Sequence, residues 1–258
     1  MPEDPNPFPP GRVAALNSGA VTQFAVLDAL LDGIYSSGAV VSDVLRWGDT
    51  GIGCCEGLGG EVLVIDGEAF ECTVDRAPRR MRDDEMLPFV DVCTFGEPAG
   101  EPVAGVDLDG LTAAVEARLL SRNLFHAVRI DGVMARVRTR VTARQEPPLR
   151  PLAEVAAEQV ETETARRAGT IVGFWMPRVY QGVTVAGLHL HFLSEDRRVG
   201  GHVLDVTIDD ALLSVSAFAH FSLRLPLDED FLSRELSHGE DHRITAIEGG
   251  AGRSSVND

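Results

Sequence analysis

Three histidines in residues 183–206 (VTVAGLHLHFLSEDRRVGGHVLDV) have a spacing that suits a metal site. His189 and His191 are two residues apart in a segment that alternates as a β-strand does, so their side chains project from one face. A polar turn ending in Gly200 and Gly201 follows, and His202 opens the next predicted strand. If the two strands pair, all three imidazoles meet at one point.

Three neutral imidazoles with no fourth protein ligand nearby are the donor set of a catalytic zinc site, which keeps a coordination position open. A zinc ion bound there would be a strong Lewis acid. The residues alone leave two other interpretations open. The histidines could be half-buried strand residues that bond to the backbone, or Cys54 or Cys55 could close a structural site as a fourth ligand.

The composition is that of a soluble globular protein with a large acidic excess. With 258 residues, the chain can form one large domain or two small ones. Acidic residues outnumber basic residues by 40 to 23, which gives a formal net charge of −17. This excess repels phosphate backbones, so we expect no nucleic-acid partner. An anionic substrate would need a local positive patch.

The N-terminal stretch MPEDPNPFPP has acidic residues and prolines where a signal peptide would have positive charge and an apolar run. No stretch approaches the ~18 apolar residues of a membrane span. The cysteines fit neither a CxxC metal clip nor a dense disulfide framework; they are Cys54, Cys55, Cys72 and Cys93. We therefore expect a cytoplasmic protein with reduced thiols and no membrane partner.

Apolar spacing predicts several helices and one clear strand. We expect helices at 18–31, 42–47, 111–119 and 152–158, an apolar strand at 169–176, a glycine-rich turn at 51–60, a disordered segment at 1–16 and a flexible tail at 251–258. Three further segments predict β-hairpins around Asp66-Gly67, Asp131-Gly132 and, more loosely, Asp209-Asp210.

These elements predict an α/β fold, close to α+β, with large mixed or antiparallel sheets and helices packed on them. The proline-rich stretch at 144–151 is the expected boundary between two subdomains. An N-terminal α/β subdomain would cover 17–146, and a β-rich C-terminal subdomain carrying the three histidines would cover 147–250. The metal site would lie in the cleft between them.

Other residues could act beside the metal. Glu61 begins a strand directly after a glycine pair, where a side chain can point into a cleft. Arg136, Arg138 and Arg140 alternate on one strand face. Such a row is either a solvated surface or, in so acidic a protein, a clamp that binds a substrate carboxylate bidentately.

The longer motifs resemble one family, the acetolactate decarboxylases. The resemblance rests on GTIVGFWMP and GLHLHFLSEDRRVGGHVLD, with support from LFHAVRIDG, VRTRVTARQE and GGEVLVIDGEAF. It implies zinc as the cofactor, with ligands at His189, His191 and His202. It also implies an active-site arginine at Arg140 and catalytic glutamates at Glu61 and Glu248. Where the family usually has threonine in a turn before the first glutamate, this chain has Cys54, a substrate-pocket position.

The family resemblance further implies two α/β domains, a homodimer, and a place in acetoin and butanediol formation. The reaction would convert 2-acetolactate to acetoin and carbon dioxide. The hydroxyl and ketone oxygens of 2-acetolactate can chelate one metal ion, which would stabilise the enediolate while a glutamate supplies the proton. A zinc hydrolase and a non-catalytic metal-binding module are the alternatives, although the chain lacks an HExxH or HxHxDH motif.

Overall fold

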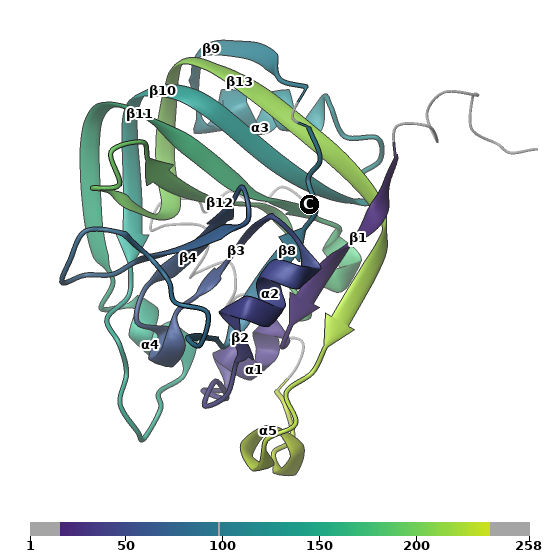
Figure 1. The fold of residues 1–258 in the computed structure, drawn as a ribbon, viewed down its shortest axis with the longest axis vertical. Helices are drawn as coiled ribbons and strands as arrows, with labels where there is room; N and C mark the ends of the chain where they lie inside the picture. The colour runs from purple at the N-terminus through teal and green to yellow at the C-terminus, as the bar shows by residue number, and fades with distance from the viewer. Residues whose placement is uncertain (1–15, 98, 238–258) are drawn as a thin grey trace, which may run out of the picture.

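One eleven-stranded mixed sheet dominates the computed structural model, which describes residues 16–97 and 99–237 (Figure 1). Its strands follow the order β10-β11-β12-β13-β1-β8-β3-β4-β5-β6, with β9 beside β13. The bounds are β1 (Leu16–Phe24), β3 (Thr50–Cys54), β4 (Glu61–Ile65), β5 (Glu68–Cys72), β6 (Arg79–Arg80), β8 (Phe89–Cys93), β9 (Glu101–Asp107), β10 (Phe125–Val141), β11 (Val160–Met176), β12 (Gly187–Ser194) and β13 (Gly200–Arg224). A second small sheet pairs β2 (Ala39–Val40) with β7 (Met86–Leu87).

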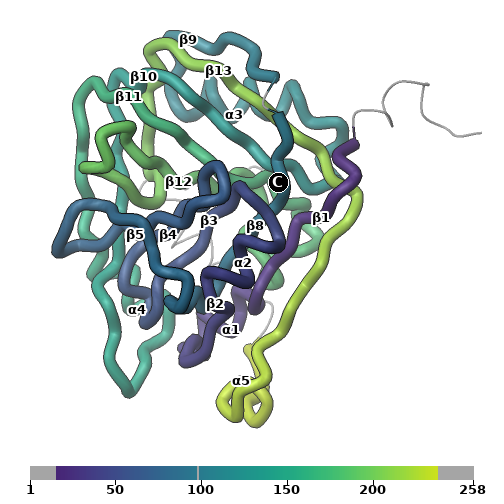
Figure 2. Tube along the Cα trace, viewed as in Figure 1, coloured from purple at the N-terminus to yellow at the C-terminus, as the bar shows by residue number. Residues whose placement is uncertain are grey.

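Four strands close into a ring of pairings. β10 pairs with both β11 and β13, while β12 lies between β11 and β13. β13 then continues beyond the ring and pairs in parallel with β1, which joins the remaining strands (Figure 2). One continuous strand therefore links the two parts of the sheet.

The helices are short. Among the described residues they are α1 (Leu27–Leu31), α2 (Val41–Trp47), α3 (Leu108–Glu116), α4 (Leu152–Ala156) and α5 (Glu229–Ser233). Asp107 caps α3 by accepting a hydrogen bond from the Gly110 amide, and the helix buries Leu111 and Val115 against β10 and β13. The observed fold is mixed α+β, with a large mixed sheet and few helices, as predicted. No helix in the described part is long and apolar enough to cross a membrane.

The predicted helix at 18–31 is wrong over most of its length. Residues up to Phe24 form β1, and only Leu27–Leu31 is helical. Val21, Thr22 and Gln23 are buried in succession because β1 lies between β13 and β8. Tertiary pairing on both sides therefore overrides the helix-like spacing of the apolar residues.

Only one of the three predicted hairpins exists. Asp66 and Gly67 both have positive φ angles, 52° and 76°, and turn the chain between β4 and β5. Asp131 and Gly132 instead lie inside β10, where Asp131 accepts hydrogen bonds from Arg129 and Thr170. Asp209 and Asp210 lie inside β13, where the pairing with β10 slips by one residue at Asp209. An acidic pair marks a turn only if no neighbouring strand extends the ladder through it.

The remaining local predictions are largely confirmed. Helices occur at the predicted 42–47, 111–119 and 152–158 segments, within a few residues, and the predicted strand at 169–176 is the second half of β11. The predicted turn at 51–60 is wrong in its first half, which belongs to β3. The strand that carries the first two histidines begins at Gly187. The predicted disordered segment lies outside the described residues apart from Leu16, as does the tail.

The proposed boundary at 144–151 separates strands that lie side by side in one sheet. β10 precedes the boundary, yet it pairs with β11 and β13, which follow it. Segments assigned to different subdomains thus share one sheet. The division of the chain into two subdomains remains a prediction.

A buried carboxyl on β8 gives a testable pH dependence of stability. Asp91 pairs with Gln23 of β1 and is 1% exposed, and burial raises its pKa to about 8, against a smaller opposing effect of Thr184. The unfolded carboxyl loses its proton near pH 4, at about its ordinary pKa. Between these values the folded chain binds the extra proton, so stability falls as pH rises.

We therefore expect Asp91→Asn to stabilise the protein increasingly at higher pH. The difference in unfolding free energy between variant and wild type should grow by several kcal/mol, about 4 at most, from pH 5 to pH 9. Denaturant unfolding at both pH values measures it. A difference that stays constant with pH would show that Asp91 is ionised in the folded protein.

Candidate active site

Three imidazoles converge where β12 and β13 pair. His191 lies directly opposite His202, and His189 is two residues earlier on β12. Nε2 of His189 is 3.0 Å from Nδ1 of His202 and 3.2 Å from Nε2 of His191. The predicted strand pairing is confirmed, and it brings together three ligand atoms that all lie within 4.8 Å of one another.

These separations fit a tetrahedral metal site. Nitrogen ligands bind zinc at ~2.0–2.1 Å, so two of them at a tetrahedral angle lie about 3.3 Å apart. The two measured separations of 3.0 and 3.2 Å are close to that value. In the described part of the chain, neither Cys54 nor Cys55 belongs to this group of ligand atoms. The donor set therefore fits a metal ion that keeps a position open.

The backbone fixes the orientation of His191. Its Nδ1 lies 2.9 Å from the carbonyl oxygen of Val62 on β4. Because a carbonyl oxygen can only accept, Nδ1 carries the proton and the lone pair of Nε2 faces the other histidines. Burial lowers the pKa of His189 to about 3, and the nearby charge of Arg140 acts in the same direction. Both effects keep His189 neutral, as a metal-binding imidazole must be.

Glu61 and Arg140 lie beside the histidines. Oε2 of Glu61 is 3.5 Å from Nε2 of His191, and Oε1 is 3.8 Å from Nη1 of Arg140. Arg140 lies directly opposite His202 in the β10–β13 pairing. The side chains of Arg140 and Glu61 are only 4% and 10% exposed, so they act in a medium that strengthens charge interactions.

A glycine precedes two of the site residues, Glu61 and His202, and allows the backbone conformation that positions each of them. Gly60, just before Glu61, has a φ of +131°, and a Cβ there would lie 2.2 Å from the carbonyl oxygen of Cys72. Gly201, just before His202, has a φ of +149°, and its Cβ would lie 2.5 Å from the carbonyl oxygen of Arg140. A side chain at either glycine would displace the residue that follows it.

The three arginines of the predicted row differ in their surroundings. Arg136 pairs with Glu163 and Asp205, and Arg138 pairs with Glu161, all at the surface. Arg140 alone of the three is buried and reaches the histidines. The solvated-surface interpretation therefore describes Arg136 and Arg138, while the geometry of Arg140 suits a ligand clamp.

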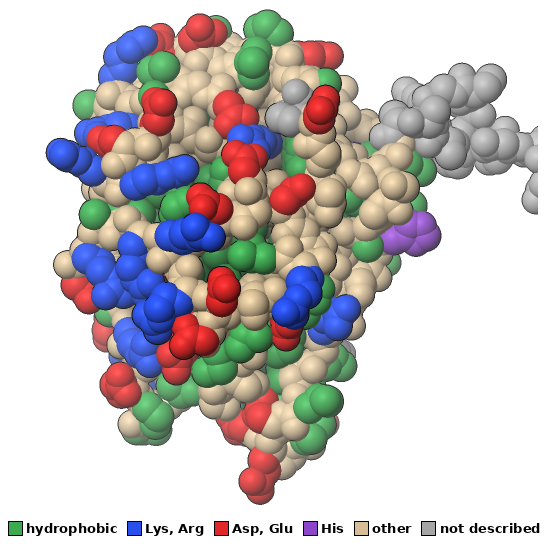
Figure 3. All heavy atoms as spheres, in the orientation of Figure 1, with side chains coloured by type: hydrophobic (Ala, Val, Ile, Leu, Met, Phe, Trp, Pro, Cys, Tyr) green, Lys and Arg blue, Asp and Glu red, His purple; other side chains and the backbone are tan. Residues whose placement is uncertain are grey.

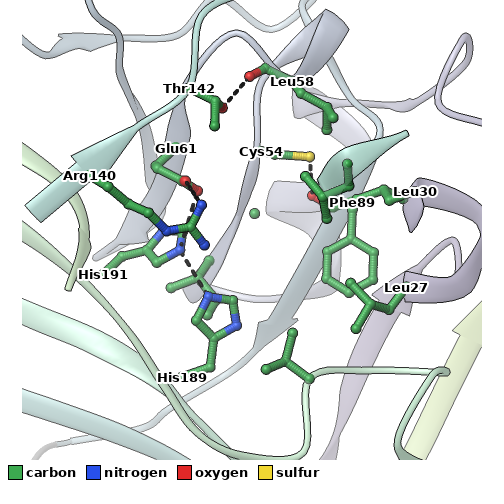
Figure 4. A pocket seen from close by; sticks show the side chains of 14 residues that line it. Leu27, Leu30, Cys54, Leu58, Glu61, Phe89, Arg140, Thr142, His189 and His191 are labelled. Atoms are coloured by element: carbon green, nitrogen blue, oxygen red, sulfur yellow. Dashed lines mark hydrogen bonds and ion pairs between the residues drawn. The ribbon is translucent and has the colours of Figure 1, made fainter. Parts of the chain in front are cut away.

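The site opens into a small pocket with one polar and one apolar side. Its volume is about 50 Å³. Glu61, Arg140 and His191 form the polar side, and apolar side chains face them (Figure 4). The apolar wall consists of Leu27, Leu30, Ile52, Leu58, Phe89, Leu152 and Val185. A wider groove of about 500 Å³ near Trp175 and Arg178 lacks such a group of titratable side chains.

Cys54 lines the same pocket on β3, directly opposite Glu61 in the pairing with β4. Its thiol is 3.9 Å from the carbonyl oxygen of Phe89. Burial, followed by the charge of Glu61, raises the pKa of this thiol far above neutrality. The side chain is therefore a protonated thiol in the pocket wall. Glu248, the other glutamate singled out in the sequence, lies outside the described residues.

Comparisons with known proteins identify the family of this chain. A family model described as alpha-acetolactate decarboxylase matches residues 21–238. The chain belongs to the alpha-acetolactate decarboxylase family. It is 34% identical to the alpha-acetolactate decarboxylase of Bacillus licheniformis, over 90% of this chain and 93% of that one. It is 35% identical to the alpha-acetolactate decarboxylase of Methanosarcina mazei, over 90% and 81% of the two chains.

The fold agrees with solved structures of the family. The crystal structure of alpha-acetolactate decarboxylase from Bacillus subtilis strain 168 superposes with a TM-score of 0.86 at 32% identity, covering 90% of this chain and all of that one. A Staphylococcus aureus protein described as similar to alpha-acetolactate decarboxylase also gives 0.86, at 30% identity and 89% coverage of this chain. The protein is therefore an enzyme of the acetolactate decarboxylase class.

Several parts of the site gave no usable signal in the sequence. The carbonyl of Val62 belongs to an ordinary apolar strand, and the apolar wall combines α1, β8, α4 and the segment before β12. Leucine and valine at such positions look like any core residue. Only the three-dimensional arrangement shows that these side chains face a pocket.

Proposed function

We propose that this enzyme converts 2-acetolactate to acetoin and carbon dioxide, using zinc bound by His189, His191 and His202. The observation that supports this most is the set of three converging imidazoles, two of whose separations suit a tetrahedral ion, with Glu61 and Arg140 beside it. A zinc ion bound there supplies Lewis acidity toward the oxygen atoms of a substrate. The side chains around the ion would bind the substrate and supply the proton.

Arg140 is the group that would bind the substrate carboxylate. Its guanidinium is buried and planar, so it can hold a carboxylate through two parallel hydrogen bonds. This fixes the carboxylate against the polar side of the pocket and orients the bond that breaks. In so acidic a chain, the buried cation also provides the local positive charge that an anionic substrate needs.

Glu61 is the group that would supply the proton of the product. Loss of carbon dioxide leaves an electron pair on the carbon that carried the carboxylate, and one proton at that carbon completes acetoin. The Glu61 carboxyl lies within 4 Å of both His191 and Arg140, so it can reach a molecule bound between them. Glu248 remains a proposed second carboxylate on the basis of the family resemblance.

The apolar wall suits the rest of the substrate. 2-Acetolactate carries two methyl groups, and the leucine and phenylalanine side chains opposite Arg140 offer them an apolar surface (Figure 4). The same wall excludes water from the carbon that must be protonated. Family membership also supports the proposals that the enzyme is a cytoplasmic homodimer and takes part in acetoin and butanediol formation.

An acetoin assay on 2-acetolactate tests this function. We expect acetoin and carbon dioxide in equal amounts, loss of activity on chelation, and recovery when zinc is added back. Hydrolysis of an ester with no acetoin formed would favour the hydrolase alternative. Metal binding without either reaction would favour a non-catalytic module.

The Cys54→Thr variant tests whether Cys54 is part of the pocket wall or a metal ligand. The protonated thiol is outside the histidine group, so the variant should bind metal as wild type does. A threonine hydroxyl donates a stronger hydrogen bond than a thiol, so activity should be retained or improved. Metal analysis and steady-state kinetics measure both properties. Loss of metal from this variant would show that sulfur is a ligand.

A further inference from the structure

A second cavity adjoins the candidate active site and shares Arg140 with it. The cavity has a volume of about 100 Å³ and lies among β5, β10, β11 and the start of β13. Its polar lining comes from three arginines and three threonines, namely Arg76, Arg140, Arg198, Thr73, Thr139 and Thr162. Arg140 lines both spaces, so the two cavities meet at this residue.

The lining of this cavity is positively charged, although the protein as a whole is acidic. The lining residues include three arginines and no acidic residue, whereas the whole chain has a formal net charge of −17. The sequence contains no lysine, so every such cation is an arginine. Arginine side chains gather on one side of the face shown in Figure 3. A cavity lined only by cationic and neutral groups attracts anions.

The cations differ in their existing partners. Arg76 pairs with Glu71, whose side chain does not line the cavity. Within the described residues, Arg198 has no ion-pair partner for its guanidinium. The cavity thus offers the guanidinium of Arg198 to a ligand with several oxygen acceptors.

We propose that this cavity binds a small oxyanion, of the class of inorganic phosphate or bicarbonate. Its volume is well below the roughly 300 Å³ of a pocket for a drug-sized ligand, which excludes nucleotides and other large anions. Guanidinium groups bind oxyanions through paired, charge-assisted hydrogen bonds. Phosphate from solution and bicarbonate formed from carbon dioxide share this chemistry.

Occupancy of the cavity is coupled to the catalytic pocket through Arg140. An oxyanion in the cavity attracts the same guanidinium that would bind the substrate carboxylate. The two anions therefore weaken each other's binding by equal factors. This coupling rests on the proposed function, whereas oxyanion binding itself does not.

Calorimetric titration with phosphate and, separately, with bicarbonate tests the site, with sodium chloride holding ionic strength constant. We compare wild type with Arg198→Gln and with a control variant, Arg166→Gln. Arg166 is an exposed arginine outside the cavity, and its replacement changes the net charge by the same amount. Arg198→Gln should weaken oxyanion binding about tenfold, and Arg166→Gln less than twofold. The anion that binds more tightly shows whether the ligand is phosphate from solution or bicarbonate formed from carbon dioxide. Equal binding by both variants, or no binding by wild type, would overturn the site.

Kinetics on 2-acetolactate test the coupling. Saturating oxyanion should raise the KM of wild type several-fold, and Arg198→Gln should need about tenfold more oxyanion for the same effect. A KM that does not respond while calorimetry shows binding would overturn the coupling alone. An enzyme that binds the oxyanion but makes no acetoin would refute the proposed function and leave the oxyanion site standing.

Discussion

Replacing His191 with alanine is expected to remove the bound metal and lower the decarboxylation rate about 10³-fold or more, because Lewis acidity contributes several kcal/mol to such reactions. His191 is 1% exposed, and its ring is held by the Val62 carbonyl with Nε2 toward the other two histidines. Two remaining imidazoles would leave a metal ion with half a tetrahedral shell. Metal content and acetoin formation should therefore fall together.

His220→Ala is the matched control. His220 lies on the same long strand, β13, as His202, but its side chain is exposed and does not belong to the histidine group. Its replacement should leave metal content and rate within twofold of wild type. Circular dichroism checks that both variants fold. A fully active His191→Ala protein that retains its metal would refute the proposed ligand set.

The sequence predicted the convergence of the three histidines well because its signal was local. His189 and His191 share a strand face by simple alternation, and His202 follows after a short polar turn, so only one strand pairing had to be assumed. The structure confirms that pairing. Arg140 needed the family resemblance, because alternation alone places Arg136 and Arg138 on the same face.

The wrong secondary-structure predictions concern segments whose conformation depends on strands that are distant in the sequence. Val21 and Phe24 have helix-like spacing with Leu27, yet strands that are distant in the sequence, β8 and β13, flank them and extend the chain. Gly132 follows an aspartate just as Gly67 does. A Cβ at Gly132 would lie 2.4 Å from the carbonyl oxygen of Asp210, which shows a close strand approach and no turn. No local pattern carries that information.

Replacing Arg140 with lysine should lower kcat/KM about 10²-fold while metal content stays at the wild-type level. Lysine keeps the positive charge, but it lacks the planar fork that holds a carboxylate through two hydrogen bonds. In a site where the side chain is only 4% exposed, a lost charged hydrogen bond costs about 2–3 kcal/mol, since water cannot replace it. The separate measurement of metal content distinguishes substrate binding from loss of the ion.

Arg138→Lys is the matched control on the same strand. Arg138 is separated from Arg140 by one residue, is 37% exposed, and pairs with Glu161 at the surface. A surface ion pair contributes about 0–1 kcal/mol, so this variant should stay within a few-fold of wild type. The proposed role of Arg140 depends on the contrast between the two positions. If both lysine variants show equal, small losses, Arg140 stabilises the sheet without binding the substrate carboxylate, and another cation must do so.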